Sequence, residues 1–263
     1  GDAWGCRTPG CSPNCENLIN DKGDACNRFI ELWNLVFMQF YHHPDGSRDP
    51  LPAPGIDTGM GMERAAVILQ GTDTVYETDL FRPLISRVEE LSRKGYGDDR
   101  HADYAMRAIA EHGRSATFLI ADGVVPGNEG RGYVLRRVIR RAIRHGRQLG
   151  LEEAFLGEIA LTTIDKMGEV YPELRNHRDF VLTVLRLEEE RFQHAFQNGY
   201  LILADALVES ASLPGDVVFR LWDTFGFPVE MTQEIARESG VEIDMEGFER
   251  EMEAQRERGR ASA

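Results

Sequence analysis

Seven arginines and no carboxylate occupy residues 131–147, although the whole chain carries a net charge of -14. At about 100° per residue, six of these arginines share an arc of about 140° on a helix, and apolar side chains fill the opposite arc. The planar guanidinium group can grip a phosphate with two parallel hydrogen bonds. The window therefore predicts a helix with one face for a core and one for a polyanion. The arginines on that face are Arg136, Arg137, Arg140, Arg141, Arg144 and Arg147.

Two other interpretations of this window stay open. A run of like charge is usually a solvated face balanced by acidic neighbours, and a basic amphipathic helix also suits anionic lipid. The acidic balance of the whole chain argues against indiscriminate nucleic-acid binding, because most of the surface repels a polyanion. We therefore expect any nucleic acid to dock on the arginine face in one defined orientation.

The composition is that of a globular chain: 263 residues, 42% of them hydrophobic and 28% charged, are enough for two modest domains. Apolar runs are only a few residues long and no signal peptide opens the chain, so we expect a cytoplasmic protein with no membrane partner. The chain begins with Gly1 rather than Met, and we expect it to be a piece of a larger protein.

Four cysteines crowd the first 26 residues with the spacing C-x4-C-x3-C-x10-C. The glycines and prolines between them leave this segment without a core of its own, so we expect a crosslink. A tetrahedral thiolate Zn²⁺ site is one possibility, two disulfides would suit an exported chain, and free thiols in a loop are the third. The candidate metal ligands are Cys6, Cys11, Cys15 and Cys26.

The residue pattern changes character near residue 72. Before it, aromatic and β-branched residues predict a strand over 28–41, His43-Pro44-Asp45-Gly46 predicts a turn, and alternating prolines keep the next segment extended up to Asp57. From residue 73 onward a period of 3.6 dominates. Helices are predicted near 77–94, 101–121, 130–149, 152–168, 174–208, 216–223, 230–239 and 246–258.

Four stretches resemble successive signatures of the alanyl-tRNA synthetase family, in the family's order and at compatible separations. They are ELWNLVFMQF, GIDTGMGMERAAVILQG, FLIADGVVPGNEGRGYVLRRVIRRAIRHGRQLG and FRLWDTFGFPVEMT. The resemblance covers residues 28–263, and the second stretch is similar to motif 3 of class II aminoacyl-tRNA synthetases. In that family the enzyme activates alanine with ATP and then esterifies it to the 3′ end of its tRNA.

The resemblance implies an α+β, predominantly α fold with two domains. Residues 1–72 would hold the C-terminal part of a class II catalytic domain, with the last strands of its antiparallel sheet and the motif 3 helix. Residues 73–263 would form a helical domain that recognises the acceptor stem of tRNA(Ala).

The resemblance also implies roles for residues near motif 3. Arg64 matches the arginine that holds the γ-phosphate of ATP, and Gly61 is one of the glycines that let the backbone approach the nucleotide. Glu31 would help to hold ATP through Mg²⁺. The alternative for Glu31 is a solvated strand residue.

The alanine pocket is implied by a second group of residues. Asp57 matches the carboxylate that receives the ammonium group of alanine. Gly59 matches a position beside the substrate methyl group, where a Cβ would crowd it. Asn34 and Val36 match further pocket positions and share one face of their strand because side chains alternate. The alternative for Asp57 is an N-cap on the following turn.

In the helical part, Asn128 and Asp223 resemble the two residues that read a G·U wobble pair in the acceptor stem. An amide offers a donor and an acceptor, and a carboxylate accepts from the exocyclic amine of guanine in the minor groove. The arginines of 131–147 would then position the stem by its phosphates. The alternatives are a loop residue in left-handed geometry for Asn128 and a helix cap for Asp223.

The chain also departs from the family, because motifs 1 and 2 do not occur in it. Motif 2 supplies an arginine to the α-phosphate of ATP, so we expect no alanylation from this polypeptide alone. A second hypothesis is a non-catalytic RNA-binding protein that uses the same helical domain. Asp57, Gly59 and Arg64 favour the ligase, because a pure RNA binder does not need them.

Overall fold

The computed structural model describes residues 31–209 and 212–261. The four cysteines lie outside the described residues, so their pairing and the zinc hypothesis stay predictions. The chain divides into two compact units, residues 1–78 and 79–263, which are described separately below. The fold is predominantly helical with two small two-stranded sheets, which confirms an α+β, mostly α chain.

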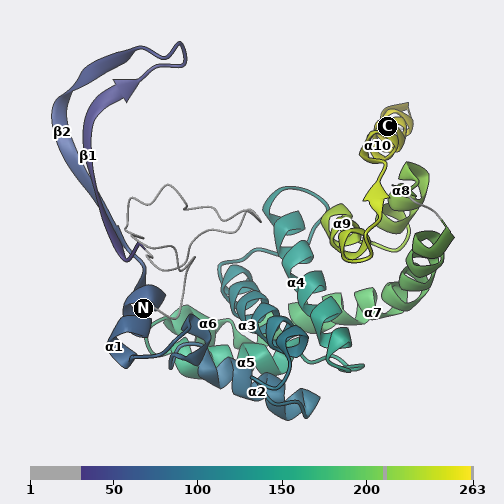
Figure 1. The fold of residues 1–263 in the computed structure, drawn as a ribbon, viewed down its shortest axis with the longest axis horizontal. Coiled ribbons are helices and arrows are strands. Elements are labelled where there is room, and N and C mark those ends of the chain that lie inside the picture. The colour runs from purple at the N-terminus through teal and green to yellow at the C-terminus, as the bar shows by residue number, and fades with distance from the viewer. Residues whose placement is uncertain (1–30, 210–211, 262–263) are drawn as a thin grey trace, which may run out of the picture. The chain divides into compact units, whose positions relative to one another are not determined.

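The first unit contains an antiparallel hairpin of β1 (Trp33–His42) and β2 (Arg48–Met60), followed by α1 (Met62–Gln70) and the short 3-10 helix η1 (Val75–Glu77) (Figure 1). The predicted turn is confirmed, and the carboxylate of Asp45 closes it by accepting hydrogen bonds from the backbone and hydroxyl of Ser47 at 2.9 and 2.7 Å. The pairing register shifts between Met38 and Phe40, opposite the proline-rich part of β2. Prolines lack the N–H that a ladder needs, which accounts for this irregularity.

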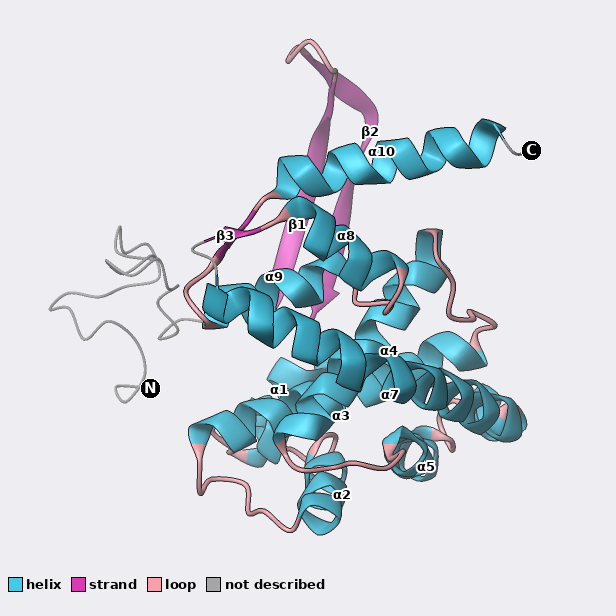
Figure 2. Cartoon of the chain, turned by 90° about the vertical axis from the view of Figure 1, so that its right-hand side faces the viewer, coloured by secondary structure: helices cyan, strands magenta, loops and turns pink. Residues whose placement is uncertain are grey.

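The second unit is helical, and its core lies between the long helices. The helices are α2 (Arg82–Ser92), α3 (Arg100–Ala121), α4 (Gly130–Gln148), α5 (Leu156–Met167), α6 (Pro172–Asn176), α7 (Arg178–Glu209), α8 (Gly215–Asp223), α9 (Val229–Glu238) and α10 (Met245–Ala261). Helix α3 packs along α4, and α5 and α7 cover the same core (Figures 1 and 2). The apolar face of α4 buries Leu135, Ile139 and Ile143 there.

The last three helices of the second unit form a smaller group. Helix α10 packs on α8 (Figure 2). The short strands that precede these two helices, β3 (Ser212–Leu213) before α8 and β4 (Glu242–Ile243) before α10, pair with each other in parallel. Close approach of Gly215 and Gly247 makes this packing possible, because a Cβ on Gly215 would lie 2.4 Å from the Gly247 backbone. The group carries the far wall of the pocket described below.

Most of the predicted helices are confirmed within a few residues, and three predictions need correction. The helix predicted from residue 77 begins at Arg82, with Pro83 in its first turn. The helix predicted over 174–208 is two helices, because α6 ends at Asn176 and α7 begins at Arg178. The helix predicted from 152 begins at Leu156, where the buried Glu189 carboxylate accepts from the Leu156 N–H at 3.1 Å.

None of the described helices combines the length and the apolar character that crossing a membrane requires.

Candidate functional site

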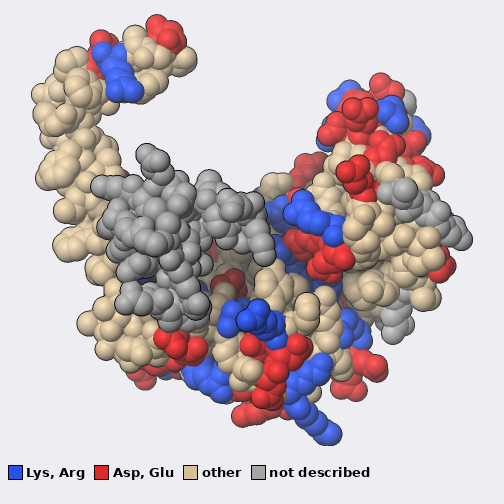
Figure 3. Space-filling model, in the orientation of Figure 1, with Lys and Arg blue, Asp and Glu red and all other residues tan. Residues whose placement is uncertain are grey.

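The arginines of α4 face carboxylates from α7 and α9. The shortest contacts join Arg136 to Glu188 at 3.3 Å, Arg137 to Glu230 at 2.5 Å, Arg140 to Glu188 at 2.6 Å, Arg141 to Glu234 at 2.7 Å, and Arg144 to Glu238. On the face of the helical unit visible in Figure 3, basic and acidic side chains are interspersed. The arginine helix therefore neutralises much of its charge inside the protein.

Two of these arginines are almost inaccessible to solvent: Arg140 is 9% exposed and Arg144 is 5% exposed. Arg140 pairs with Glu188, which is 2% exposed, and donates a second hydrogen bond to the carbonyl oxygen of Gly226. Its guanidinium also lies over the Phe192 ring, 4.8 Å from the centroid. Burial lowers the pKa of Arg140, and Glu188 acts in the opposite direction.

The prediction of an open basic face on α4 is therefore wrong for Arg140 and Arg144. A guanidinium that leaves water needs charged partners, and carboxylates distant in sequence supply them. The signal was present in the sequence as Glu230, Glu234 and Glu238, which recur every four residues and so form one stripe along α9. The proposed phosphate contacts of Arg136, Arg137 and Arg141 stay predictions.

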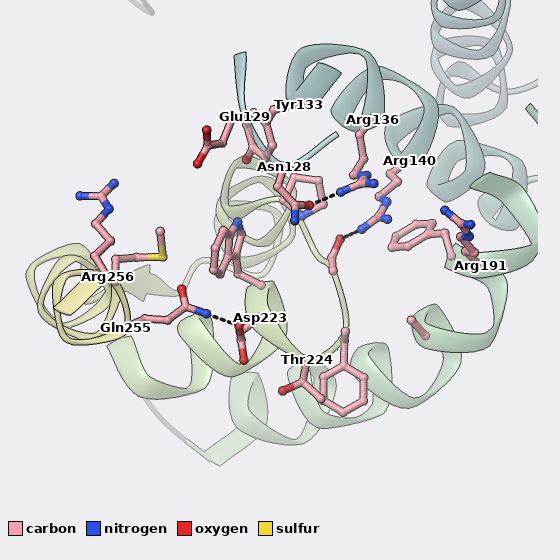
Figure 4. A pocket seen from close by; sticks show the side chains of 17 residues that line it. Asn128, Glu129, Tyr133, Arg136, Arg140, Arg191, Asp223, Thr224, Gln255 and Arg256 are labelled. Carbon is pink, nitrogen blue, oxygen red and sulfur yellow. Dashed lines mark hydrogen bonds between the residues drawn. The ribbon is translucent and has the colours of Figure 1, made fainter. Parts of the chain in front are cut away.

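A pocket of about 570 Å³ opens beside the N-terminal half of α4 and brings Asn128 and Asp223 to one cavity. Figure 4 shows these two side chains on opposite walls, with α10 along one edge. The pocket is lined by Asn128, Glu129, Tyr133, Arg136, Arg140, Arg191, Phe192, Ala195, Trp222, Asp223, Thr224, Phe225, Gly226, Pro228, Met252, Gln255 and Arg256. The structure thus joins two residues that lie almost a hundred positions apart in the chain.

Asn128 is exposed in the loop that leads into α4, and the backbone of this loop is tightly held. The Gly127 N–H donates to the Gly132 carbonyl at 3.0 Å, and a Cβ on Gly132 would lie 2.7 Å from the Val125 carbonyl oxygen. Among the described non-glycine residues, only Arg93 has a positive φ. The left-handed interpretation of Asn128 is therefore wrong, and Gly130, two residues further on, takes that geometry with φ +56°.

Asp223 is the last residue of α8 and is also exposed. Its Oδ1 accepts a hydrogen bond from Nε2 of Gln255 on α10 at 2.6 Å (Figure 4). The C-cap of α8 is Thr224, so the helix-cap interpretation of Asp223 is not supported by the contacts. The remaining carboxylate oxygen can accept a hydrogen bond from a ligand.

Two further arginines line the pocket, and sequence reasoning did not identify either of them. Arg191 on α7 is exposed and has no carboxylate partner among the described residues. Arg256 on α10 is exposed and lies 3.2 Å from Glu253, a neighbour on its own helix. Exposed pairs of this kind are weak and exchange readily with other anions. The available positive charge at the pocket thus comes from α7 and α10 as well as α4.

In the first unit, the hairpin register places four predicted residues on one face. Asn34 is opposite Gly59, and Val36 is opposite Asp57. Directly opposite residues of an antiparallel pair project to the same side, and alternation along β1 adds Val36 to the face of Asn34. A Cβ on Gly59 would lie 3.7 Å from Oδ1 of Asn34, so the glycine leaves open space beside that amide.

The remaining predicted residues of this unit gather where β2 leads into α1. Arg64 in the first turn of α1 donates from Nη1 to the carbonyl oxygen of Glu31. The Glu31 carboxylate accepts from Nδ2 of Asn34 at 3.3 Å. Gly61 is the N-cap of α1, so the N-cap interpretation of Asp57, which lies inside β2, is wrong. The guanidinium of Arg64, the carboxylate of Glu31 and the amide of Asn34 thus lie close together, and all three residues are exposed.

Comparisons with known proteins show the family to which the chain belongs. Residues 15–263 match the family described as tRNA synthetases class II (A). The chain belongs to this family. Among relatives of this class II synthetase chain, the alanine–tRNA ligase of Desulfosudis oleivorans is 46% identical over 99% of the chain, and that of Geobacillus thermodenitrificans is 47% identical over 96%. The alanine–tRNA ligase of Desulforudis audaxviator is 46% identical over the full chain.

The class II synthetase chain spans 29% of the length of each of these three relatives. Its match to the family covers the hairpin, α1 and the whole helical unit. Both groups of residues described above therefore lie within the matched part.

Proposed function

We propose that the chain is part of an alanine–tRNA ligase, which activates alanine with ATP and transfers it to tRNA(Ala) in the cytoplasm. This chain would supply motif 3 and the recognition of the acceptor stem. The observation that carries the proposal is the pocket that joins Asn128 to Asp223 in a chain whose relatives are alanine–tRNA ligases. The exposed polar side chains of Asn128 and Asp223, on opposite walls of this pocket, can meet a base edge.

The chemistry of the hairpin face suits the amino acid. Asp57 would receive the ammonium group of alanine through a charge-assisted hydrogen bond. Gly59 would leave room for the methyl group, with Asn34 and Val36 beside it on the same face. A larger residue in place of Gly59 would fill the space that a small substrate needs.

The residues at the start of α1 suit ATP and Mg²⁺, which the class II family implies. ATP supplies the phosphoanhydride bond whose cleavage drives activation of the amino acid. The guanidinium of Arg64 would bind a terminal phosphate, and the backbone at Gly61 would allow close approach of the nucleotide. The Glu31 carboxylate would help to hold Mg²⁺, since oxygen ligands are those that this cation prefers.

The pocket suits the minor groove of an RNA stem, which is wide and shallow and exposes base edges to short side chains. Guanine presents its exocyclic amine there as a donor, and the free oxygen of Asp223 would accept from it. Asn128 would contact the same base pair from the opposite wall. A carboxylate close to RNA costs electrostatic energy unless it gains such a hydrogen bond, which makes Asp223 a reader of bases rather than of phosphates.

The proposal is tested by measuring discrimination between matched acceptor-stem hairpins that differ only in a G·U or G·C pair. Asn128→Ala and Asp223→Ala should each reduce the preference for G·U by about 1–3 kcal/mol. The salt dependence of binding should stay as in the unmodified chain, because neither side chain neutralises a phosphate. If both variants keep the original preference, the reading site lies elsewhere. If the unmodified chain shows no preference, the proposed recognition role is wrong.

A further inference from the structure

The orientation of the Asn128 amide is fixed by its neighbour Arg136. Nη1 of Arg136 donates to Oδ1 of Asn128 (Figure 4), and Nη2 donates to the Pro126 carbonyl at 3.4 Å. A guanidinium carries donors and no acceptor, so only the oxygen of the amide can face it. The two N–H bonds of Nδ2 must then point away from Arg136. Asn128 is thereby presented as a hydrogen-bond donor.

Arg136 is itself held from below by a buried carboxylate. Its Nε forms an ion pair with Oε1 of Glu188 at 3.3 Å, although this nitrogen makes no hydrogen bond among the described residues, and its side chain is 18% exposed. The same oxygen pairs with Arg140 at 2.6 Å, so one buried carboxylate ties two arginines one helical turn apart. Loss of either partner of a buried ion pair is costly, so this arrangement has little freedom to change. The guanidinium of Arg136 is thus preorganised before any ligand arrives.

We propose that Arg136 is a positioning residue, which acts on RNA recognition by locking Asn128 as a donor and makes no phosphate contact of its own. The proposal rests on the function proposed above. A donor on one wall and the acceptor oxygen of Asp223 on the other are complementary to a base pair that shows both an acceptor and the guanine amine in the minor groove. A freely rotating amide would also accept, and would therefore discriminate less between base pairs.

The test uses the full chain and the same pair of RNA hairpins. Arg136→Met removes the N–H donors of the guanidinium and keeps an unbranched side chain. The variant should lower the G·U preference by about 5- to 150-fold, the effect also expected of Asn128→Ala. The double variant Arg136→Met/Asn128→Ala should be no less selective than Asn128→Ala alone, since Arg136 acts only through the Asn128 amide. The salt slope should not change. Arg136→Lys keeps one donor and should restore part of the preference.

Asn128→Asp provides a second test that leaves the arginine network intact. The aspartate can still accept from Arg136 but has no N–H to offer, so the proposal expects loss of the G·U preference at unchanged thermal stability. This variant answers the question even if Arg136→Met does not fold. A retained preference in Asn128→Asp would overturn the donor assignment.

Arg186→Met is the control, because Arg186 is an arginine of α7 that pairs with Glu190 at 2.9 Å and does not line the pocket. It should leave the preference unchanged. If Arg136→Met lowers the salt slope by about 0.7–0.9 and weakens both hairpins equally, Arg136 is a phosphate contact and the positioning role is wrong. If Asn128→Ala loses the preference while Arg136→Met keeps it, the positioning role fails and the proposed function stands.

Discussion

At the scale of single residues, the guanidinium groups of this chain can bind two kinds of anion. The planar donor array that suits a phosphate also suits a carboxylate. Arg144 contacts both Glu234 and Glu238, and Arg140 is enclosed by Glu188, Gly226 and Phe192. Which anion an arginine meets is decided by what lies opposite it in the folded chain.

Arg191 provides a prediction at this scale, because it is the pocket arginine without a carboxylate partner among the described residues. Arg191→Gln should weaken binding of G·U and G·C hairpins by the same factor and reduce the salt slope by about 0.7–0.9, the effect of one phosphate contact. Titrations at several salt concentrations measure it. Arg186→Gln is the control, because Arg186 lies on the same helix, pairs with Glu190 at 2.9 Å and is absent from the pocket wall. An unchanged slope in Arg191→Gln would show that this cation does not reach the RNA backbone.

At the scale of elements, facing stripes of opposite charge connect α4 to α9, two helices that lie far apart in the sequence. Arg137, Arg141 and Arg144 on α4 meet the glutamates of α9, and Tyr133 adds a hydrogen bond to Glu230 at 2.8 Å. Burial raises the pKa of Tyr133 to about 12, helped by Glu230, so the phenol remains a donor. The smaller helical group is thereby attached to α4, beside the pocket.

Glu189 provides a prediction about an element, because its carboxylate caps the start of α5. It accepts from the Phe155 and Leu156 N–H groups at 2.9 and 3.1 Å, and burial raises its pKa from 4.5 to about 7. The folded chain therefore binds more protons than the unfolded chain between about pH 4.5 and 7. Its contribution to stability is present below that window and is lost as the pH rises through it.

Glu189→Gln removes this titration and keeps an oxygen that can accept from both N–H groups. The unmodified chain should lose stability as the pH rises from 5 to 8, whereas the variant should not lose this contribution. The free energy of unfolding of the variant minus that of the unmodified chain should therefore be about 1–3 kcal/mol larger at pH 8 than at pH 5. Urea unfolding at both pH values measures the change. Glu190→Gln, an exposed neighbour that pairs with Arg186, should show no such trend. A difference between Glu189→Gln and the unmodified chain that does not vary with pH would contradict the raised pKa.

At the scale of the whole molecule, the two compact units carry separate chemistry. Asp57, Gly59 and Arg64 lie in the unit of residues 1–78, and the pocket lies entirely in residues 79–263. The hairpin exposes large apolar side chains on both faces, for example the consecutive residues Leu35 at 54% and Val36 at 48%. Two strands alone bury too little apolar surface to be stable by themselves.

This division provides a prediction about the whole molecule. Arg64→Ala and Asp57→Ala should leave both the G·U preference and the salt slope unchanged, because neither residue belongs to the unit that holds the pocket. The hairpin-binding measurement used for Asn128→Ala checks this directly, and Asn128→Ala serves as the positive control. A loss of preference in Arg64→Ala would show that RNA reading depends on the motif 3 unit.

The sequence by itself determined the local features of this chain. Periodicity placed most helices, turn residues placed the hairpin, and long signatures such as the one around Asn128 indicated the family, because such signals depend only on residues close together in the chain. The tertiary structure decided the partners. Glu188 and the glutamates of α9 lie 48 to 94 positions from the arginines they neutralise, and Gln255 lies 32 positions from Asp223. Ion pairing and burial depend on distance in space, so only the folded chain could show which arginines are buried and which polar groups remain free.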